Sequence, residues 1–183
     1  MHLCSRDDVA RLRQSGELSL SMPDGAEPVF LDEHRLALHI AEIHRLTGEA
    51  VDLGDTDAAS SDPLDPTDLR LDPGSFYLGI TRERLTLGGG LAASLHTRSR
   101  YARLGLELLG SSNFVVPGFG STGAAPLVFE ISVKKVTQGF SPTTPYCFLL
   151  LYRLSSPRTT ANSLDYRRRF PLHHPTQVRD LTA

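Results

Sequence analysis

Short segments in the second half of the chain either alternate apolar with polar residues or are continuously apolar, and both patterns are typical of β-strands. Glycine, proline or charged residues separate these segments, which predicts short connections between them. The segments that we predict as strands are 75–81, 83–87, 91–97, 102–109, 127–133 and 145–154. The last is almost wholly apolar, as expected of a strand buried on both faces. The pattern as a whole indicates a mainly β fold, either a sandwich, a jelly roll or a small barrel.

The chain starts with the pattern of a short helix. Ser5 is followed by two acidic residues in the expected first turn, which is typical of an N-cap with a complemented helix dipole. Val9 and Leu12 lie on one side of this helix, and Gly16 ends it. A small strand is expected over residues 17–20.

The middle of the chain and its last segment have weaker patterns. Residues 36–46 fit a helix or a strand, but large apolar residues at 36, 38 and 40 alternate with smaller or polar ones, which favours a strand. Residues 52–73 are rich in aspartate, serine and proline and predict an exposed, mobile loop. The polar, basic segment 157–183 predicts a flexible tail unless a ligand orders it. We expect a single domain over residues 1–183.

The composition argues against several classes of partner. The net charge of 183 residues is −2, and the chain has five tyrosines and no tryptophan, so a nucleic-acid-binding surface is not expected. The longest apolar run is much shorter than a membrane span, and the first residues are too charged for a signal peptide. The two cysteines, Cys4 and Cys147, form neither a disulfide framework nor a metal motif, which favours a reducing cytoplasm.

Three arginines lie close together in an otherwise apolar, glycine-rich region. Arg98, Arg100 and Arg103 surround the hydroxyl of Ser99, and guanidinium groups beside a hydroxyl suit phosphate oxygens. Arg103 has apolar neighbours, so we expect it to be partly buried and paired. The alternative is a solvated surface loop.

Glu130 is the one acidic residue of the apolar segment 125–133. Strand alternation places it on one face with Val128 and Ser132. We interpret it as a desolvated general acid or base with Arg103 as its partner, and the alternative is an edge residue that points to water.

A zinc site is not predicted. The seven histidines have no metalloprotease spacing, and the His-x-Glu and Pro-Cys-x-x-Cys pattern of zinc deaminases is absent from the sequence.

These segments together resemble the dCTP deaminases of the trimeric dUTPase superfamily. LCSRDDVARLRQSGELSL is similar to the N-terminal helix and strand of that family, and RSRYARLGL is similar to its R-S-S-x-A-R-L-G motif. VVPGFG followed by LVFE is similar to its D-P-G-W/F-x-G loop and the strand that ends in L-E. The order and approximate spacing of the motifs are preserved over most of the chain.

The resemblance implies a distorted jelly roll, a homotrimer with active sites between subunits, and a nucleotide substrate. It also implies deamination of a cytosine nucleotide without zinc, with Mg²⁺ bound through the substrate phosphates. By their matches to the family motifs, Glu130 is the catalytic glutamate, and Arg103 helps to hold the reacting base and water.

The same matches assign the other candidate residues. Arg98 and Ser99 hold phosphate, and Ser99 assists proton transfer, while the backbone of Val128 and Phe129 reads the pyrimidine. Phe119 lies in the loop that contacts the substrate. In the tail, Arg169, Phe170 and His173 fall near the family's phosphate ligands.

Three departures from the family pattern concern substrate choice. Arg100 replaces the second serine of the motif, which adds a phosphate contact or changes the accepted phosphate length. Val116 replaces the aspartate before Pro-Gly, which disfavours dUTPase activity and affects sugar recognition. The stretch from Pro117 to Glu130 is a few residues longer than the pattern, with STGAA as the expected insertion.

The leading hypothesis is therefore a zinc-independent hydrolase that converts a cytosine nucleotide, with dCTP as the first candidate, to the uracil nucleotide and ammonia. Variant substrates are CTP, dCMP and CMP. Two alternatives are a non-catalytic nucleotide-binding relative and a pyrophosphatase of the dUTPase type, which Val116 disfavours.

Overall fold

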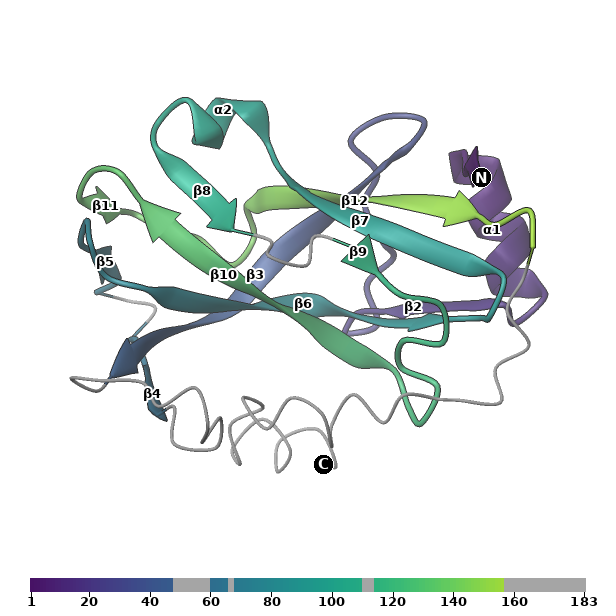
Figure 1. Cartoon of the computed structure of the whole chain (residues 1–183), viewed down its shortest axis with the longest axis horizontal. Coiled ribbons are helices and arrows are strands. Elements are labelled where there is room, and N and C mark those ends of the chain that lie inside the picture. Colours follow the sequence, from purple (N-terminus) through teal and green to yellow (C-terminus); the bar gives the residue numbers. More distant parts are fainter. Residues whose placement is uncertain (48–59, 66–67, 110–113, 157–183) are drawn as a thin grey trace.

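The computed structural model describes residues 1–47, 60–65, 68–109 and 114–156 (Figure 1). Its helices are α1 (Arg6–Gln14) and α2 (Ser99–Ala102). Its strands are β1 (His2–Leu3), β2 (Leu18–Ser21), β3 (Arg35–Thr47), β4 (Ser60–Pro63), β5 (Arg70–Leu71), β6 (Tyr77–Leu87), β7 (Leu91–Thr97), β8 (Leu106–Leu109), β9 (Phe114–Val115), β10 (Ala125–Val133), β11 (Thr137–Gln138) and β12 (Pro145–Arg153). The predicted mainly β architecture with one N-terminal helix is confirmed. Neither helix in these ranges is long and apolar enough to cross a membrane.

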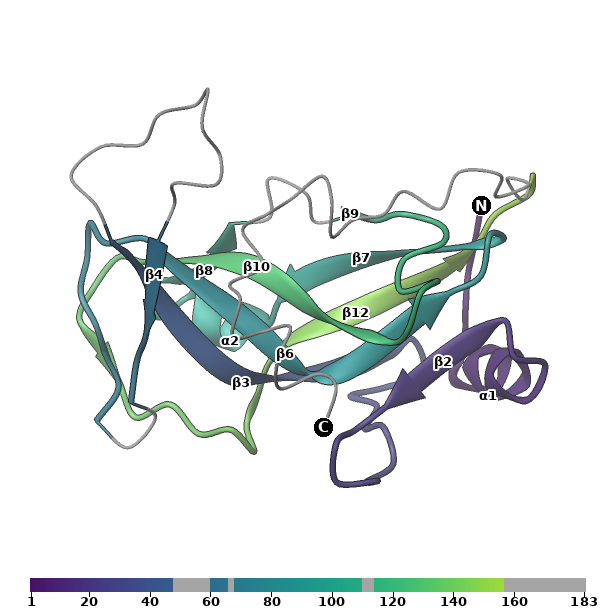
Figure 2. The same cartoon turned by 90° about the horizontal axis from the view of Figure 1, so that it is seen from below.

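Most strands belong to one antiparallel sheet of ten strands. Its main path runs β8-β10-β6-β3-β12-β7-β9, with β2 added to β6, β4 to β3 and β1 to β12. The sheet curls strongly, so that its faces are curved rather than flat (Figure 2). A separate pair, β5 and β11, lies at one end of the molecule (Figure 1).

Strand β3 is shared by the two halves of the sheet. Residues 35–39 pair with β12, whereas residues 40–45 pair with β6, and a bulge lies between Ile40 and Glu42. Where β3 changes partner, the buried carboxylate of Glu83 on β6 accepts a hydrogen bond from the backbone N–H of His39 at 2.9 Å. Its other oxygen lies 2.6 Å from Nδ1 of the same histidine. The pair joins β6 to β3 at the point where their regular backbone pairing ends.

The core is formed by residues at every second position along the strands, whose side chains point inward. On β10 these are Leu127, Phe129, Ile131 and Val133, each almost completely buried. Helix α1 adds Val9 and Leu12, as its spacing predicted. The exposed-loop prediction for residues 52–73 falls partly outside the described residues. It is wrong for the part around β5, because Leu69 and Leu71 belong to the core, whereas Asp62 and Pro63 of β4 are exposed.

Two strand predictions need correction. The segments 75–81 and 83–87 are one continuous strand, β6, because Glu83 points into the protein and binds His39 instead of forming a charged turn. The segment 102–109 is a strand only from Leu106, since α2 and a turn at Gly105, with φ of 89°, precede it. On β12 one face is buried and the other is half-buried, so burial on both faces is only partly found.

Both cysteines are buried free thiols. Burial raises the pKa of Cys147 far above its ordinary value, and the nearby charge of Glu83 raises it further. Burial also raises the pKa of Cys4. Neither thiol therefore has the low pKa of a reactive cysteine.

Ser5 forms a complete capping box at the start of α1. Its hydroxyl accepts from the N–H of Asp8 at 3.1 Å, and the carboxylate of Asp8 accepts from the N–H of Ser5 at 2.9 Å. This backbone donor, followed by the side chains of Arg11 and Ser5, lowers the pKa of Asp8 well below its ordinary value. The stabilisation is thus present above the ordinary carboxyl pKa and is lost only as the pH falls toward the lowered one.

Replacing the cap should weaken the helix measurably. We expect Ser5→Ala to lower the free energy of unfolding by about 1 kcal/mol, because the N–H of Asp8 loses its acceptor. Thermal denaturation followed by circular dichroism should show a melting temperature lower by roughly 2–4 °C. Ser19→Ala, at an exposed position of β2, is the control, and an equal loss there would contradict the capping argument.

Candidate functional site

Glu130 lies on β10 between two core residues. It pairs with Leu78 of β6 and Leu109 of β8. Its neighbours Phe129 and Ile131 are 3% and 0% exposed, whereas Glu130 is half-buried on the opposite face. Val128 and Ser132 share its face, as strand alternation predicted. The carboxylate therefore stands on a rigid strand and is partly withdrawn from water.

The same face of the sheet continues across β6 onto β3. Glu130 is in register with Leu78 and then with His44, and the adjacent row is Val128, Ile80 and Glu42. Leu78 and Ile80 are buried on this face. Since neighbouring strands are about 4.8 Å apart, the backbone of His44 lies roughly 10 Å from that of Glu130.

The sequence pattern did not predict the carboxylate of Glu42 or the imidazole of His44, which lie on this face. His44 is 3% exposed, and its Nε2 lies 3.1 Å from a carboxylate oxygen of Glu42. A signal for them was present in the segment 36–46, but the bulge in β3 shifts the alternation after Ile40. A simple period of two therefore places these side chains on the wrong faces.

Arg98 is fixed between α2 and the start of β12. Its Nη1 donates to the carbonyl of Pro145 at 2.9 Å, and its backbone N–H donates to the carbonyl of Tyr146 at 3.0 Å. Its guanidinium carbon lies 5.9 Å from the ring centre of Tyr101. These contacts orient the arginine, and they use only part of the five donors of a guanidinium group.

Ser99 and Arg100 lie on the first turn of α2, and both are exposed. The guanidinium of Arg100 lies 5.4 Å from the ring centre of Tyr101, on whose ring Arg98 also packs. The two arginines and the hydroxyl thus lie together at one short helix, and their contact with phosphate stays a prediction.

Arg103 does not have the environment that its sequence predicted. It is exposed, because α2 has no buried residue and stands away from the core (Figure 1). Its side chain forms no hydrogen bond or ion pair with any residue in the described ranges. The carbonyl of Gly105 accepts a hydrogen bond from the backbone N–H of Lys134 at 2.8 Å. Lys134 directly follows β10, and its backbone is roughly 13 Å along the chain from that of Glu130. Within one chain the predicted burial of Arg103 and its pairing with Glu130 are therefore wrong.

The loop from Val116 to Gly123 is fastened to the other end of β6. The N–H of Leu87 donates to the carbonyl of Phe119 at 2.8 Å, and the N–H of Gly118 donates to the carbonyl of Leu87 at 3.1 Å. Because Glu130 pairs with Leu78, the distance to this loop along β6 is up to roughly 30 Å. Figure 1 shows the loop and α2 well apart. Val116 and Phe119 are thus not brought to Glu130 in the single chain.

Arg169, Phe170 and His173, and the tail from 157 onward, lie outside the described residues. Within the described ranges, no group of three or more histidine, cysteine, aspartate or glutamate residues is arranged to hold a metal ion.

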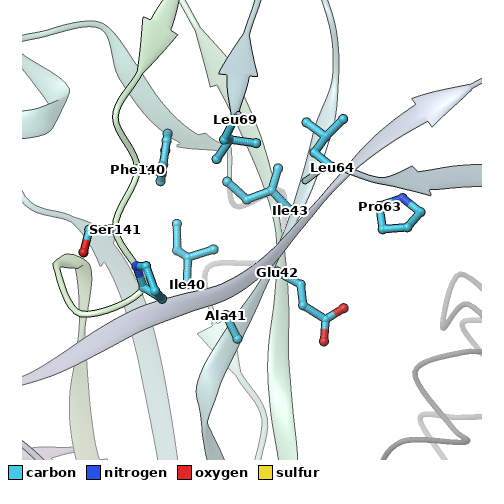
Figure 3. A pocket seen from close by; sticks show the side chains of 10 residues that line it. Ile40, Ala41, Glu42, Ile43, Pro63, Leu64, Leu69, Phe140 and Ser141 are labelled. Atoms are coloured by element: carbon cyan, nitrogen blue, oxygen red, sulfur yellow. The ribbon is translucent and has the colours of Figure 1, made fainter. Parts of the chain in front are cut away.

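An apolar pocket of about 240 Å³ lies beside β3 (Figure 3). The side chains that point into it are Ile40, Ile43, Leu64, Leu69 and Phe140, whereas Glu42 points away. It lacks the cationic groups that a nucleotide phosphate needs and contains none of the predicted site residues. It is therefore not the predicted anion site.

The sequence profile of the family described as "dCTP deaminase-like" matches residues 32–142, which is more than half of the chain. This protein belongs to that family, and the resemblance inferred from its motifs is confirmed. The matched segment includes Arg98, Ser99, Arg103, Val116 and Glu130.

Curated relatives carry the name "dCTP deaminase, dUMP-forming". The protein from Dictyoglomus thermophilum is 34% identical over 91 residues, which cover 49% of this chain and 45% of the relative. The protein from Beutenbergia cavernae is 38% identical over 87 residues, which cover 48% of this chain and 44% of the relative. The matches thus span less than half the length of either relative.

A solved structure supports the fold. The 2'-deoxycytidine 5'-triphosphate deaminase from Agrobacterium tumefaciens matches with a TM-score of 0.60 and 16% identity, over 82% of this chain and 48% of that chain. This likeness shows a shared fold and confirms the predicted fold class.

The position of the Val116–Gly123 loop should depend on Gly120. Its φ is +70°, and a Cβ there would lie 2.3 Å from the carbonyl oxygen of Leu85. Gly25 has a similar φ of +72° but no atom within 4 Å of such a Cβ. We expect Gly120→Ala to destabilise by at least about 2 kcal/mol more than Gly25→Ala, measured by urea unfolding, because only the first must displace backbone. Equal losses would show that the loop is not held closely against β6.

Proposed function

We propose that this protein hydrolyses the C4 amino group of a cytosine nucleotide, with dCTP as the first candidate substrate. The observation that carries the proposal is the half-buried carboxylate of Glu130 on β10, within the segment that matches the family. The names of the curated relatives support the choice of dCTP.

The proposed reaction needs one proton carrier and no resident metal. Glu130 takes a proton from water as the oxygen attacks C4, and it then passes protons to N3 and to the departing amine. The C4–N bond breaks, and the products are the uracil nucleotide and ammonia. Arg103 and Ser99 would stabilise charge and assist proton transfer at the reacting base.

The arginines at α2 suit the phosphates of such a substrate. Arg98 is oriented by Pro145 and Tyr146, and Ser99 and Arg100 extend the donor group outward. Mg²⁺ would bind through the phosphate oxygens rather than in a protein cage. In this proposal the backbone of Val128 and Phe129 reads the pyrimidine, Val116 and Phe119 lie over the sugar, and Arg169 and His173 reach the phosphates.

We further propose that the active sites lie between subunits of a homotrimer. The wide separation of Glu130 from the loop at Phe119, and the exposed position of Arg103, support this proposal, since one chain does not assemble all the motifs. A neighbouring subunit could supply the missing side chains, as cyclic oligomers commonly do.

Loss of the carboxylate should abolish turnover without loss of folding. We expect Glu130→Gln to reduce kcat at least roughly 10³-fold, because the amide cannot accept the proton from water. Ammonia release and the ultraviolet change from cytosine to uracil should be followed with dCTP, CTP, dCMP and CMP. Glu107→Gln is a matched control, because Glu107 lies on the neighbouring β8 and its ion pair with Lys134 is exposed.

The products distinguish the competing functions. With dCTP as substrate, dUTP alone fits a deaminase, whereas dUMP would show that phosphate hydrolysis also occurs despite Val116. Ligand-induced thermal stabilisation without any product would favour the non-catalytic relative. Full activity of Glu130→Gln would remove the proposed base.

Mixed oligomers test whether Arg103 and Glu130 act across a subunit boundary. Glu130→Gln and Arg103→Ala should each be inactive alone. Co-expression of the two should restore activity in about a quarter of the sites of randomly mixed trimers, since only those sites receive both native side chains. Recovery is not expected if both residues come from the same subunit, and its absence in verified mixed trimers would contradict the proposed arrangement.

A further inference from the structure

β10 is the strand whose backbone is proposed to read the base, and its pairing with β6 is interrupted between Pro126 and Val128. Pro126 pairs with Arg84 and Val128 pairs with Ile80. Residues 81–83 of β6 therefore face the single residue Leu127 on β10, which makes a bulge. Such a bulge leaves a backbone N–H without its regular partner on the opposite strand.

The hydroxyl of Thr81 fills the place of that partner. It accepts a hydrogen bond from the N–H of Leu127 at 2.9 Å and donates to the carbonyl of Glu83 at 2.8 Å. Thr81 is 2% exposed and Leu127 is 6% exposed, so water does not readily replace this bond.

The bulge is also fixed on its other side. The carboxylate of Glu83 binds both the backbone N–H and Nδ1 of His39 on β3, at 2.9 and 2.6 Å. A continuous path of hydrogen bonds therefore runs from β3 through Glu83 and Thr81 to Leu127 of β10. The next residue of β10 is Val128, and Glu130 follows two positions later.

From this geometry we infer that Thr81 is a positioning residue for recognition of the pyrimidine, acting through the backbone of β10 at Leu127 and Val128. The inference rests on the proposed function. Without the hydroxyl, the buried N–H of Leu127 loses its acceptor, and β10 can shift at the residue beside the base. Glu130 is farther along the strand and remains held by its pairing with β6 and β8.

The test compares Thr81→Val, which removes the hydroxyl, with Thr81→Ser, which retains it. We expect Thr81→Val to raise KM for dCTP roughly tenfold with kcat changed by less than about twofold. The reason is that contacts to the pyrimidine are weakened equally in the ground state and the transition state, whereas the deamination step itself is unaffected. Thr81→Ser should restore KM to near the native value. Thr137→Val is the control, since the hydroxyl of Thr137 binds the carbonyl of Lys135 on another segment.

Amide hydrogen exchange provides a readout that does not need activity. Exchange at Leu127 should be faster in Thr81→Val and near native in Thr81→Ser, and Thr137→Val should leave it unchanged. Unchanged exchange at Leu127 in Thr81→Val would refute the hydrogen-bond argument. Faster exchange with an unchanged KM would refute the role in recognition.

A failure of the proposed function can be distinguished from a failure of the role of Thr81. A native protein that neither deaminates nor binds dCTP in a calorimetric titration would overturn that function, and with it the role of Thr81 in recognition. Binding without turnover keeps the inference testable, because the dissociation constant of dCTP then replaces KM in the same comparison of variants.

Discussion

The buried pair of Glu83 and His39 is the interaction on which the sheet depends. It lies where β3 changes its pairing partner from β12 to β6, so that regular backbone pairing does not by itself hold the two halves together there. The side-chain carboxylate of Glu83 binds the backbone N–H and the ring Nδ1 of His39. The backbone carbonyl of Glu83 separately accepts a hydrogen bond from the hydroxyl of Thr81. Loss of one member leaves a buried polar group without its partner, which is more costly than the pair is stabilising.

The geometry of the molecule divides the candidate residues into three places. Glu130 lies on β10 between β8 and β6, the arginine group lies at α2, and the Val116–Gly123 loop lies at the far end of β6. A specific backbone contact holds each place: strand pairing for Glu130, the carbonyls of β12 for Arg98, and Leu87 for the loop. The separation of Glu130 from the Val116–Gly123 loop within one chain is the reason for proposing a site shared between subunits.

Local patterns in the sequence predicted the parts that depend on near neighbours. The cap at Ser5 and the face shared by Val128 and Glu130 follow from spacing alone. The burial of Arg103 was predicted wrongly, since apolar neighbours do not reveal that α2 stands away from the core. Glu83 was missed because its partner, His39, is 44 residues away in sequence and no local signal links them. The roles of the site residues came from family motifs and remain predictions.

The position of β12 between β3 and β7 has a consequence for folding during synthesis. These strands are far apart in sequence, and β12 is the last of the described strands to be synthesised. Until then, β3 and β7 each expose an edge that can pair with another chain. Closure of this half of the sheet by long-range contacts is expected to be slow relative to local helix formation. We therefore expect the nascent protein to be most prone to aggregation before β12 pairs, and chaperone binding at that stage would protect it.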